Sequence, residues 1–135
     1  NSIHLDAFFK YGYAAKLVAE YPFFNFTAKS QVVHLFTEIH LSGFDSYKLY
    51  LIGLFDLMGG CLDASNTELS SNIIDSISIM LRNDDTQSIV LKEIDKSDIM
   101  NKIEECIDSD DEKLSTKAGE LIKDINTLNG EDNDD

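Results

Sequence analysis

The chain is poor in basic residues, cysteine, proline and tryptophan. Its 135 residues include 25 Asp and Glu against 11 Lys and Arg, two Cys, one Pro and no Trp, and the net charge is −14. This charge argues against nucleic acid and anionic membranes as partners, because both would repel the chain. Two cysteines cannot build a disulfide framework. We find no apolar run long enough to cross a bilayer and no secretory signal. Reduced cysteines fit a cytoplasmic or nuclear protein, which is the location we expect.

Aromatic and acidic residues gather at opposite ends of the chain. All thirteen Phe and Tyr lie between Phe8 and Phe55, and residues 1–44 have no net charge. Residues 84–128 carry thirteen acids and six bases, and the tail 129–135 carries four acids and no base. The tail has no apolar residue after Gly130 to bury, so we expect 129–135 to be a disordered acidic tail. Hydrophobic residues make up 43% of the chain, which is enough for a core elsewhere.

Apolar residues recur every three or four positions, which predicts helices and no strands. Val32, Val33, Phe36 and Ile39 show this spacing, and similar runs follow in the second and third parts of the chain. The predicted helices span residues 4–10, 13–21, 26–40, 46–52, 54–63, 67–82, 86–95, 98–108 and 112–127.

An internal repeat underlies this pattern. Shifting the chain by 41 residues and then by 45 places Phe36 on Ile77 and then on Ile122, and Leu17 on Met58 and then on Ile103. The positions of Tyr13 and Tyr21 are likewise apolar in both later copies. The copies span about 3–43, 44–83 and 84–128. In each copy a break precedes the second helix, and a short polar residue precedes the third, where its side chain can cap free amides. The breaks fall at Gly12, Gly53 and Asp98, and the caps at Asn25, Asn66 and Asp111.

A unit of about 40 residues with three helices resembles the armadillo repeat, a relative of the HEAT repeat. Residues 9–18 and 51–58 look like the family's junction between first and second helices, with its glycine. Residues 94–104, followed by an acidic tail, are most similar to the C-terminal repeats of importin-α. The resemblance implies an all-α, right-handed superhelical solenoid of about three repeats. It also implies a nuclear-transport adaptor whose last repeat contacts an export receptor, with candidate contacts on 98–128.

In importin-α a ladder of Trp and Asn on successive third helices holds the cargo signal. The Trp positions fall here on His34, Asp75 and Glu120, and the Asn positions fall on Glu38, Ile79 and Asp124. No Trp exists in the chain, so the cargo ladder is absent. We still expect these six residues to line a partner-binding groove, whose acids suit an extended peptide with Lys or Arg side chains.

The sequence offers little for catalysis or for binding a cofactor or metal. Cys61 and Cys106 occupy equivalent positions, and stacked repeats lie about 10 Å apart, so we expect two reduced thiols in the core. His34 and Glu38 have a metal-ligand spacing, but no second ligand pair accompanies them. There is no nucleophile elbow and no phosphate-binding glycine loop. We therefore expect a non-catalytic protein-binding module without a cofactor.

Two alternatives stay open at this point. One is a different armadillo or HEAT protein, such as a scaffold or a regulatory subunit of a kinase or phosphatase complex. The other is an enzyme on a helical bundle without repeats. The aromatic residues of the first copy are expected to lie in the hydrophobic core or to pack on a preceding repeat. The chain would then be the C-terminal piece of a longer solenoid, or its aromatic end would be a surface for forming homo-oligomers.

Overall fold

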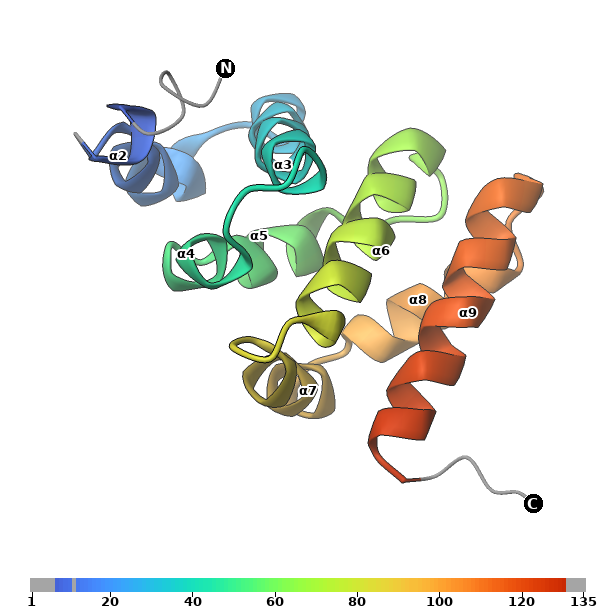
Figure 1. The fold of residues 1–135 in the computed structure, drawn as a ribbon. Helices are drawn as coiled ribbons and strands as arrows, with labels where there is room; N and C mark the ends of the chain where they lie inside the picture. The colour runs from blue at the N-terminus through green and yellow to red at the C-terminus, as the bar shows by residue number, and fades with distance from the viewer. Residues whose placement is uncertain (1–6, 11, 131–135) are drawn as a thin grey trace.

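The structure is a computed structural model that describes residues 7–10 and 12–130, and this part of the chain is helical without strands (Figure 1). Residues 7–10 are helical, and a 3₁₀ helix, η1, spans Tyr21–Phe23. The α-helices are α2 (Tyr13–Glu20), α3 (Phe26–Leu41), α4 (Ser46–Leu51), α5 (Leu54–Cys61), α6 (Thr67–Arg82), α7 (Gln87–Lys96), α8 (Ile99–Ile107) and α9 (Glu112–Leu128). The expectation of an all-α fold is confirmed, and helices α2 to α9 begin and end within two residues of the predicted bounds. The first predicted helix lies partly outside the described residues.

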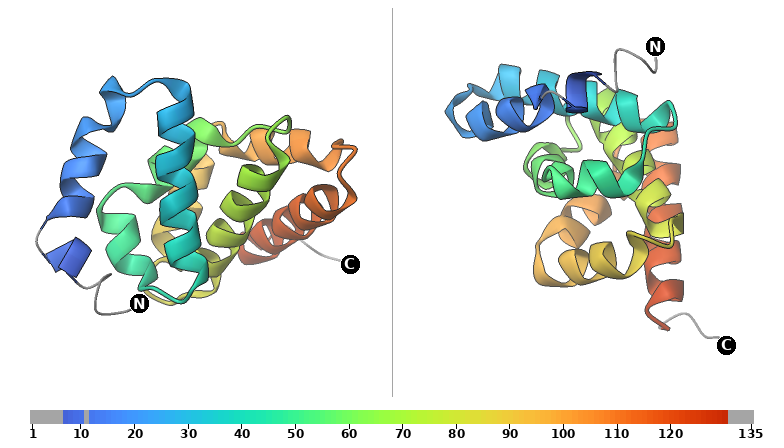
Figure 2. Two further views of the ribbon diagram at one scale, coloured as in Figure 1. Left: turned by 90° about the horizontal axis from the view of Figure 1, so that it is seen from above. Right: turned by 60° about the vertical axis from the view of Figure 1, so that its left-hand side comes forward.

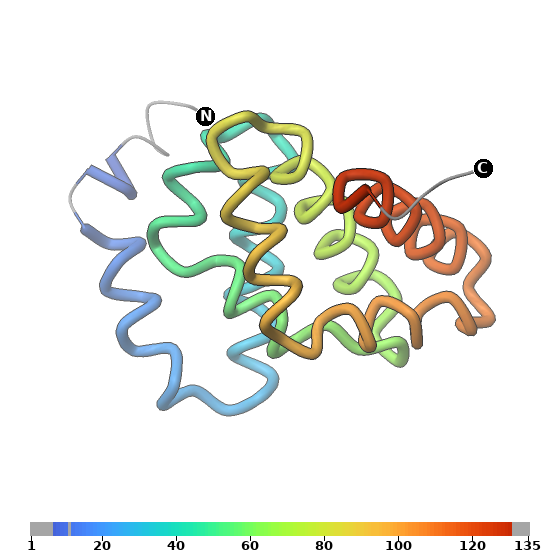
Figure 3. The backbone as a smooth tube through the Cα atoms, turned by 90° about the horizontal axis from the view of Figure 1, so that it is seen from below, coloured from blue at the N-terminus to red at the C-terminus, as the bar shows by residue number. Residues whose placement is uncertain are grey.

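The three long helices follow one another in chain order. Helix α3 packs on α6, and α6 packs on α9. The shorter helices α4, α5, α7 and α8 lie on one side of them, and α2 and α9 lie at opposite ends of the molecule (Figures 2 and 3). The hydrophobic core extends along this whole row, from Ala14 to Ile125, as one connected cluster. Helix α6 is its centre, since Ile73, Ile77 and Met80 are fully buried there.

Each long helix begins with the predicted polar cap. The side-chain oxygen of Asn25 accepts a hydrogen bond from the amide of Ala28 at 2.8 Å, and that of Asn66 accepts one from Leu69 at 3.3 Å. Asp111 accepts the equivalent bond from Leu114 at 3.0 Å. The first amides of a helix have no partner within the helix, so these side chains stabilise its first turn.

Replacing Asp111 by alanine is expected to lower the free energy of unfolding by about 1 kcal/mol, because the Leu114 amide loses its acceptor. The neighbouring variant Asp110→Ala is the matched control, since Asp110 is exposed and caps nothing. Urea unfolding followed by circular dichroism measures both. Equal effects of the two variants would contradict the capping role.

The breaks before the second helices differ in conformation. Gly12 and Gly53 have φ angles of 80° and 99°, in the left-handed region that favours glycine. Asp98, at the third break, has a φ of −92° and needs no glycine. The chain turns there instead through Ser97, which is extended with a φ of −114° and a ψ of 176°. The sequence places the third break correctly but not its geometry.

The first two residues of the predicted tail follow directly on α9. The amides of Asn129 and Gly130 still donate hydrogen bonds to the carbonyls of Ile125 and Thr127 on α9, both at about 3 Å. These two residues therefore form the turn that ends the helix. Residues 131–135 lie outside the described part of the chain, so the prediction for them is untested.

Candidate functional site

Hollows lie between successive long helices. One hollow, of about 420 Å³, separates the N-terminal halves of α3 and α6, and His34 and Phe26 lie in its wall. A second, of about 480 Å³, lies between α6 and α9. It is lined by Ile74, Asp75, Ser78, Arg82, Lys117, Glu120, Leu121, Lys123 and Asp124. It shares residues with a smaller hollow of about 400 Å³ that reaches Leu81 and Leu128.

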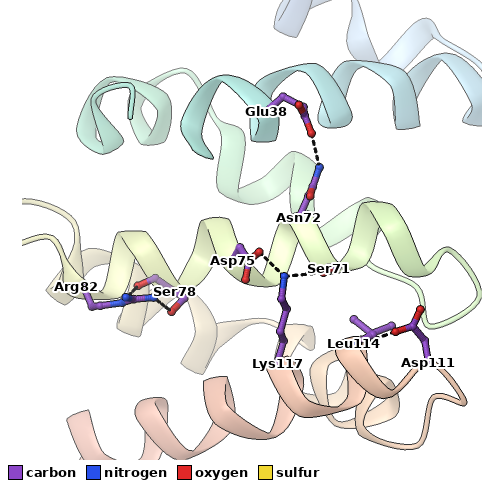
Figure 4. Close-up of polar contacts among 9 residues, drawn as sticks. All are labelled: Glu38, Ser71, Asn72, Asp75, Ser78, Arg82, Asp111, Leu114 and Lys117. Atoms are coloured by element: carbon purple, nitrogen blue, oxygen red, sulfur yellow. Dashed lines mark hydrogen bonds and ion pairs between the residues drawn. The ribbon is translucent and has the colours of Figure 1, made fainter. Parts of the chain in front are cut away.

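Four of the six predicted groove residues line these hollows. His34 lies in the first, and Asp75, Glu120 and Asp124 lie together in the second. Glu38 is exposed and lines neither hollow. Its carboxylate accepts a hydrogen bond from the Asn72 amide group at 3.1 Å (Figure 4). Ile79 is half-buried and also lines neither.

The side chains of Asn72 and Lys117 join each long helix to the one before it. Asn72 on α6 reaches Glu38 on α3. Lys117 on α9 reaches α6, where its ammonium lies 2.6 Å from the Asp75 carboxylate and 3.0 Å from the Ser71 hydroxyl (Figure 4). Asn72 and Lys117 are equivalent under the 45-residue shift. The same repeat position therefore reaches the preceding long helix twice, once through a hydrogen bond and once through an ion pair, although the two carboxylates are not at equivalent positions.

The charge of the second hollow differs from the prediction. Its three acids are accompanied by three bases, Arg82, Lys117 and Lys123, so the charges in the lining of this hollow are mixed. The Arg82 guanidinium donates to the hydroxyl of Ser78 at 2.5 Å, and Lys117 is held by Asp75. Glu120 and Asp124 are exposed and form no ion pair with any described residue.

The sequence analysis did not predict these three bases, because it took the groove residues only from the ladder positions of importin-α. The helical period of 3.6 residues could have identified these bases, because residues three or four apart lie on the same face of a helix. Arg82 lies three residues after Ile79, and Lys117 lies three residues before Glu120, so each base shares a helix face with a predicted groove residue.

His40 forms a buried polar network between α3, α4 and α6. Its Nδ1 is hydrogen-bonded to the hydroxyl of Ser76, and its Nε2 lies 2.7 Å from the hydroxyl of Ser46. The His40 side chain is only 1% exposed, and burial lowers its pKa from 6.5 to about 4. Serine beside histidine is the pair a hydrolase would use, but both hydroxyls are buried as well. No substrate can reach them, so the network is structural.

Both cysteines are free and buried, as expected for reduced core thiols. The Sγ of Cys61 lies 3.2 Å from the hydroxyl of Tyr21. Burial, with smaller effects of Glu105 and Asp63, raises the pKa of the Cys106 thiol. A thiol that keeps its proton is a poor nucleophile and a poor metal ligand, so neither role is supported for Cys106.

The described residues contain no group of three or more His, Cys, Asp or Glu side chains arranged to hold a metal ion. The pair formed by His34 and Glu38 has an N–O distance of 3.9 Å and no third ligand beside it. Within the same part of the chain, no helix has the length and apolar character needed to cross a membrane.

Comparisons with known proteins give no further guide. No protein-family model, no curated protein and no solved structure matches the chain. The armadillo resemblance is therefore a prediction from the sequence, and a functional argument depends on the geometry of the helices and their hollows.

Proposed function

We propose that the chain is a non-catalytic protein-binding module, built as a solenoid of about three armadillo-like repeats. Its partner would be an extended protein segment lying across α3, α6 and α9. The observation that carries this proposal is the serial packing of these helices, with hollows of about 420 and 480 Å³ between successive members. In stacked repeats each unit contacts only its neighbours, and the row of equivalent helices forms an extended surface for binding.

Equivalent positions with equivalent contacts support the repeat. The hydroxyls of Ser70 and Ser115, 45 residues apart, donate to the carbonyls of Asp63 and Ile107, each at 2.6 Å. Both bonds tie the start of a third helix to the end of the helix before it. Together with the three caps, they make the same local structure recur along the chain.

Glu120 and Asp124 are the charges most available to a partner. They lie four residues apart on α9, so their side chains are neighbours on the helix surface. Lys117 and Arg82 already have partners on α6. A Lys or Arg side chain of the bound segment would therefore pair with Glu120 and Asp124, while its backbone follows the hollow between α6 and α9.

Two more specific functions fall within this proposal. The resemblance of residues 94–104 to importin-α favours a nuclear-transport adaptor. The His, Asp and Glu at the ladder positions favour instead a different armadillo or HEAT scaffold, or a regulatory subunit, because a Trp ladder is what retains transport cargo. Both are binding proteins without catalysis or cofactor.

Reversing two charges tests the proposed groove. Short linear peptides selected from a random library on the wild-type chain are expected to carry Lys or Arg and to bind the double variant Glu120→Lys, Asp124→Lys at least about tenfold more weakly. Fluorescence anisotropy measures the affinities. The control is Asp95→Lys, Glu104→Lys, which makes the same charge change on exposed positions of α7 and α8.

Two results would contradict the groove. One is equal weakening by both double variants, which would mark a general effect of net charge. The other is a set of selected peptides that binds the groove variant as tightly as the wild type. Circular dichroism of each variant confirms that it is folded before the affinities are compared.

A further inference from the structure

The outer face of α2 exposes two aromatic rings. Tyr13, at the start of α2, is 60% exposed, and Phe23, in the 3₁₀ helix η1 that continues α2, is 87% exposed. The inner face of α2 packs on the core through Ala14, Leu17 and Val18. Helix α2 lies at the end of the molecule opposite α9 (Figure 3). Its outer face is therefore a separate surface, which the function proposed for α3, α6 and α9 does not use.

Four exposed residues, which we call the α2 stripe, follow one line along this face. They are Tyr13, Lys16, Glu20 and Phe23, at successive steps of three, four and three residues. These steps keep side chains on one side of an α-helix. The last step crosses η1, where three residues make one turn, so Phe23 stays in line with Glu20. The stripe thus has an aromatic ring at each end and two opposite charges between them.

Both charges of the stripe are available to a partner. Lys16 and Glu20 form no ion pair with any described residue. They lie four residues apart, but lysine before glutamate is the weaker order for a pair within one helix. Glu20 also lies at the C-terminal end of α2, where the helix dipole disfavours a carboxylate. Lys29 on α3 does not compensate it, because its ammonium lies over the ring of Tyr21, 5.4 Å from the centroid.

The α2 stripe is complementary to a second copy of itself. Positions 16 and 20 are equally far from position 18, and so are positions 13 and 23. If two copies of α2 lie antiparallel about a two-fold axis level with position 18, Lys16 of each faces Glu20 of the other. Tyr13 of each likewise faces Phe23 of the other. Every such contact occurs twice, as in the symmetric interfaces that build most homodimers.

The distribution of charge favours the same arrangement. The chain has a net charge of −14, but residues 1–44 have none, so two copies meet with least repulsion at this end. The acidic helix α9 of each copy then points away from the other. The four aromatic rings would bury on the order of 600 Å². Standard interfaces bury about 1,200 Å² or more, so we expect a weak dimer that depends on concentration.

We propose that the chain forms a two-fold symmetric dimer through the α2 stripe. The rings of Tyr13 and Phe23 supply the apolar contact, and two ion pairs between Lys16 and Glu20 set the antiparallel register. The hollows between α3, α6 and α9 stay open in this dimer, so the proposal does not depend on the function proposed for them.

Sedimentation equilibrium of the full chain, from micromolar to millimolar concentration, tests this surface. The wild-type mass is expected to rise from that of one chain toward that of two. Lys16→Glu and Glu20→Lys should each weaken the dimer at least about fivefold, because each brings like charges together at two contacts. Phe23→Ser should weaken it as well. Lys113→Glu, at an exposed position of α9, is the control with the same charge change as Lys16→Glu.

Mixing the two charge variants gives the sharpest result. An equal mixture of Lys16→Glu and Glu20→Lys chains should associate about as tightly as the wild type, because opposite charges meet at both contacts of the mixed pair. A mixture that stays monomeric would contradict the register. A wild-type chain that stays monomeric at millimolar concentration would overturn the dimer itself, without any variant. Equal weakening by Lys16→Glu and Lys113→Glu would show an effect of net charge and would also overturn the α2 stripe as the interface.

Discussion

Lowering the pH from 7 to 4 is expected to reduce the free energy of unfolding by on the order of 3 kcal/mol through His40 alone. Its pKa is about 4 in the folded chain and 6.5 when solvated, because burial disfavours the imidazolium form. The unfolded chain therefore takes up this proton first as the pH falls. The stability that neutral His40 provides is complete above pH 6.5 and is lost progressively between pH 6.5 and 4.

Urea unfolding at a series of pH values measures this loss, with His40→Gln as the variant that cannot titrate. We expect His40→Gln to be less stable than the wild type at pH 7, because the ring no longer joins Ser46 and Ser76. The difference should shrink toward pH 4, where the wild type has lost its advantage. His34→Gln is the matched control, since the His34 side chain is 44% exposed on the same helix. Parallel profiles for the wild type and His40→Gln would refute the assignment.

This network makes the contact between α3 and α6 the acid-sensitive one. Its three side chains come from α3, α4 and α6, so a charge on His40 would weaken the packing of the first predicted repeat on the second. The contact between α6 and α9 has a half-buried ion pair, formed by Lys117 and Asp75, and no buried histidine. Acid is therefore expected to loosen the aromatic end of the molecule before the acidic end.

Local signals explain why the helices could be predicted from the sequence. Helix α6 begins and ends where the apolar period and the Asn66 cap place it, at 67 and 82. A cap acts on amides two or three residues away, and an apolar stripe has the period of its own helix. The cap and the apolar stripe both depend on residues close together in the sequence, so they can be recognised without knowing how the helices pack.

Contacts between distant residues could not be predicted in the same way. Lys117 and Asp75 are 42 residues apart, and their pairing depends on how closely α9 approaches α6. The composition of the aromatic first copy likewise could not predict which of its rings are buried. Phe36 is fully buried, as expected for core, whereas Phe23 is 87% exposed. The side on which each ring lies is decided by the packing of whole helices, and the count of aromatic residues holds no information about it.

Replacing Leu121 by alanine is expected to cost about 3 kcal/mol of stability, whereas Leu35→Ala should cost less than about 1 kcal/mol. Leu35, Ser76 and Leu121 are equivalent under the repeat shifts. Ser76 faces α3, where it meets His40. Leu121 is 2% exposed and lies in the hollow between α9 and α6, whereas Leu35 is 43% exposed. One substitution therefore leaves a cavity between helices, and the other removes a side chain that is largely in water.

The two leucine variants control for each other, because both make the same chemical change in the interior of a long helix and gain the same helix propensity. Urea unfolding of the two proteins, compared at equal m-values, gives the difference directly. A large loss for Leu121→Ala alone supports the stacking of each long helix on the one before it. Comparable losses would mean that the outer face of α3 is covered in solution. A second copy of the chain on that face would then make the loss for Leu35→Ala depend on protein concentration, because dimers dissociate on dilution.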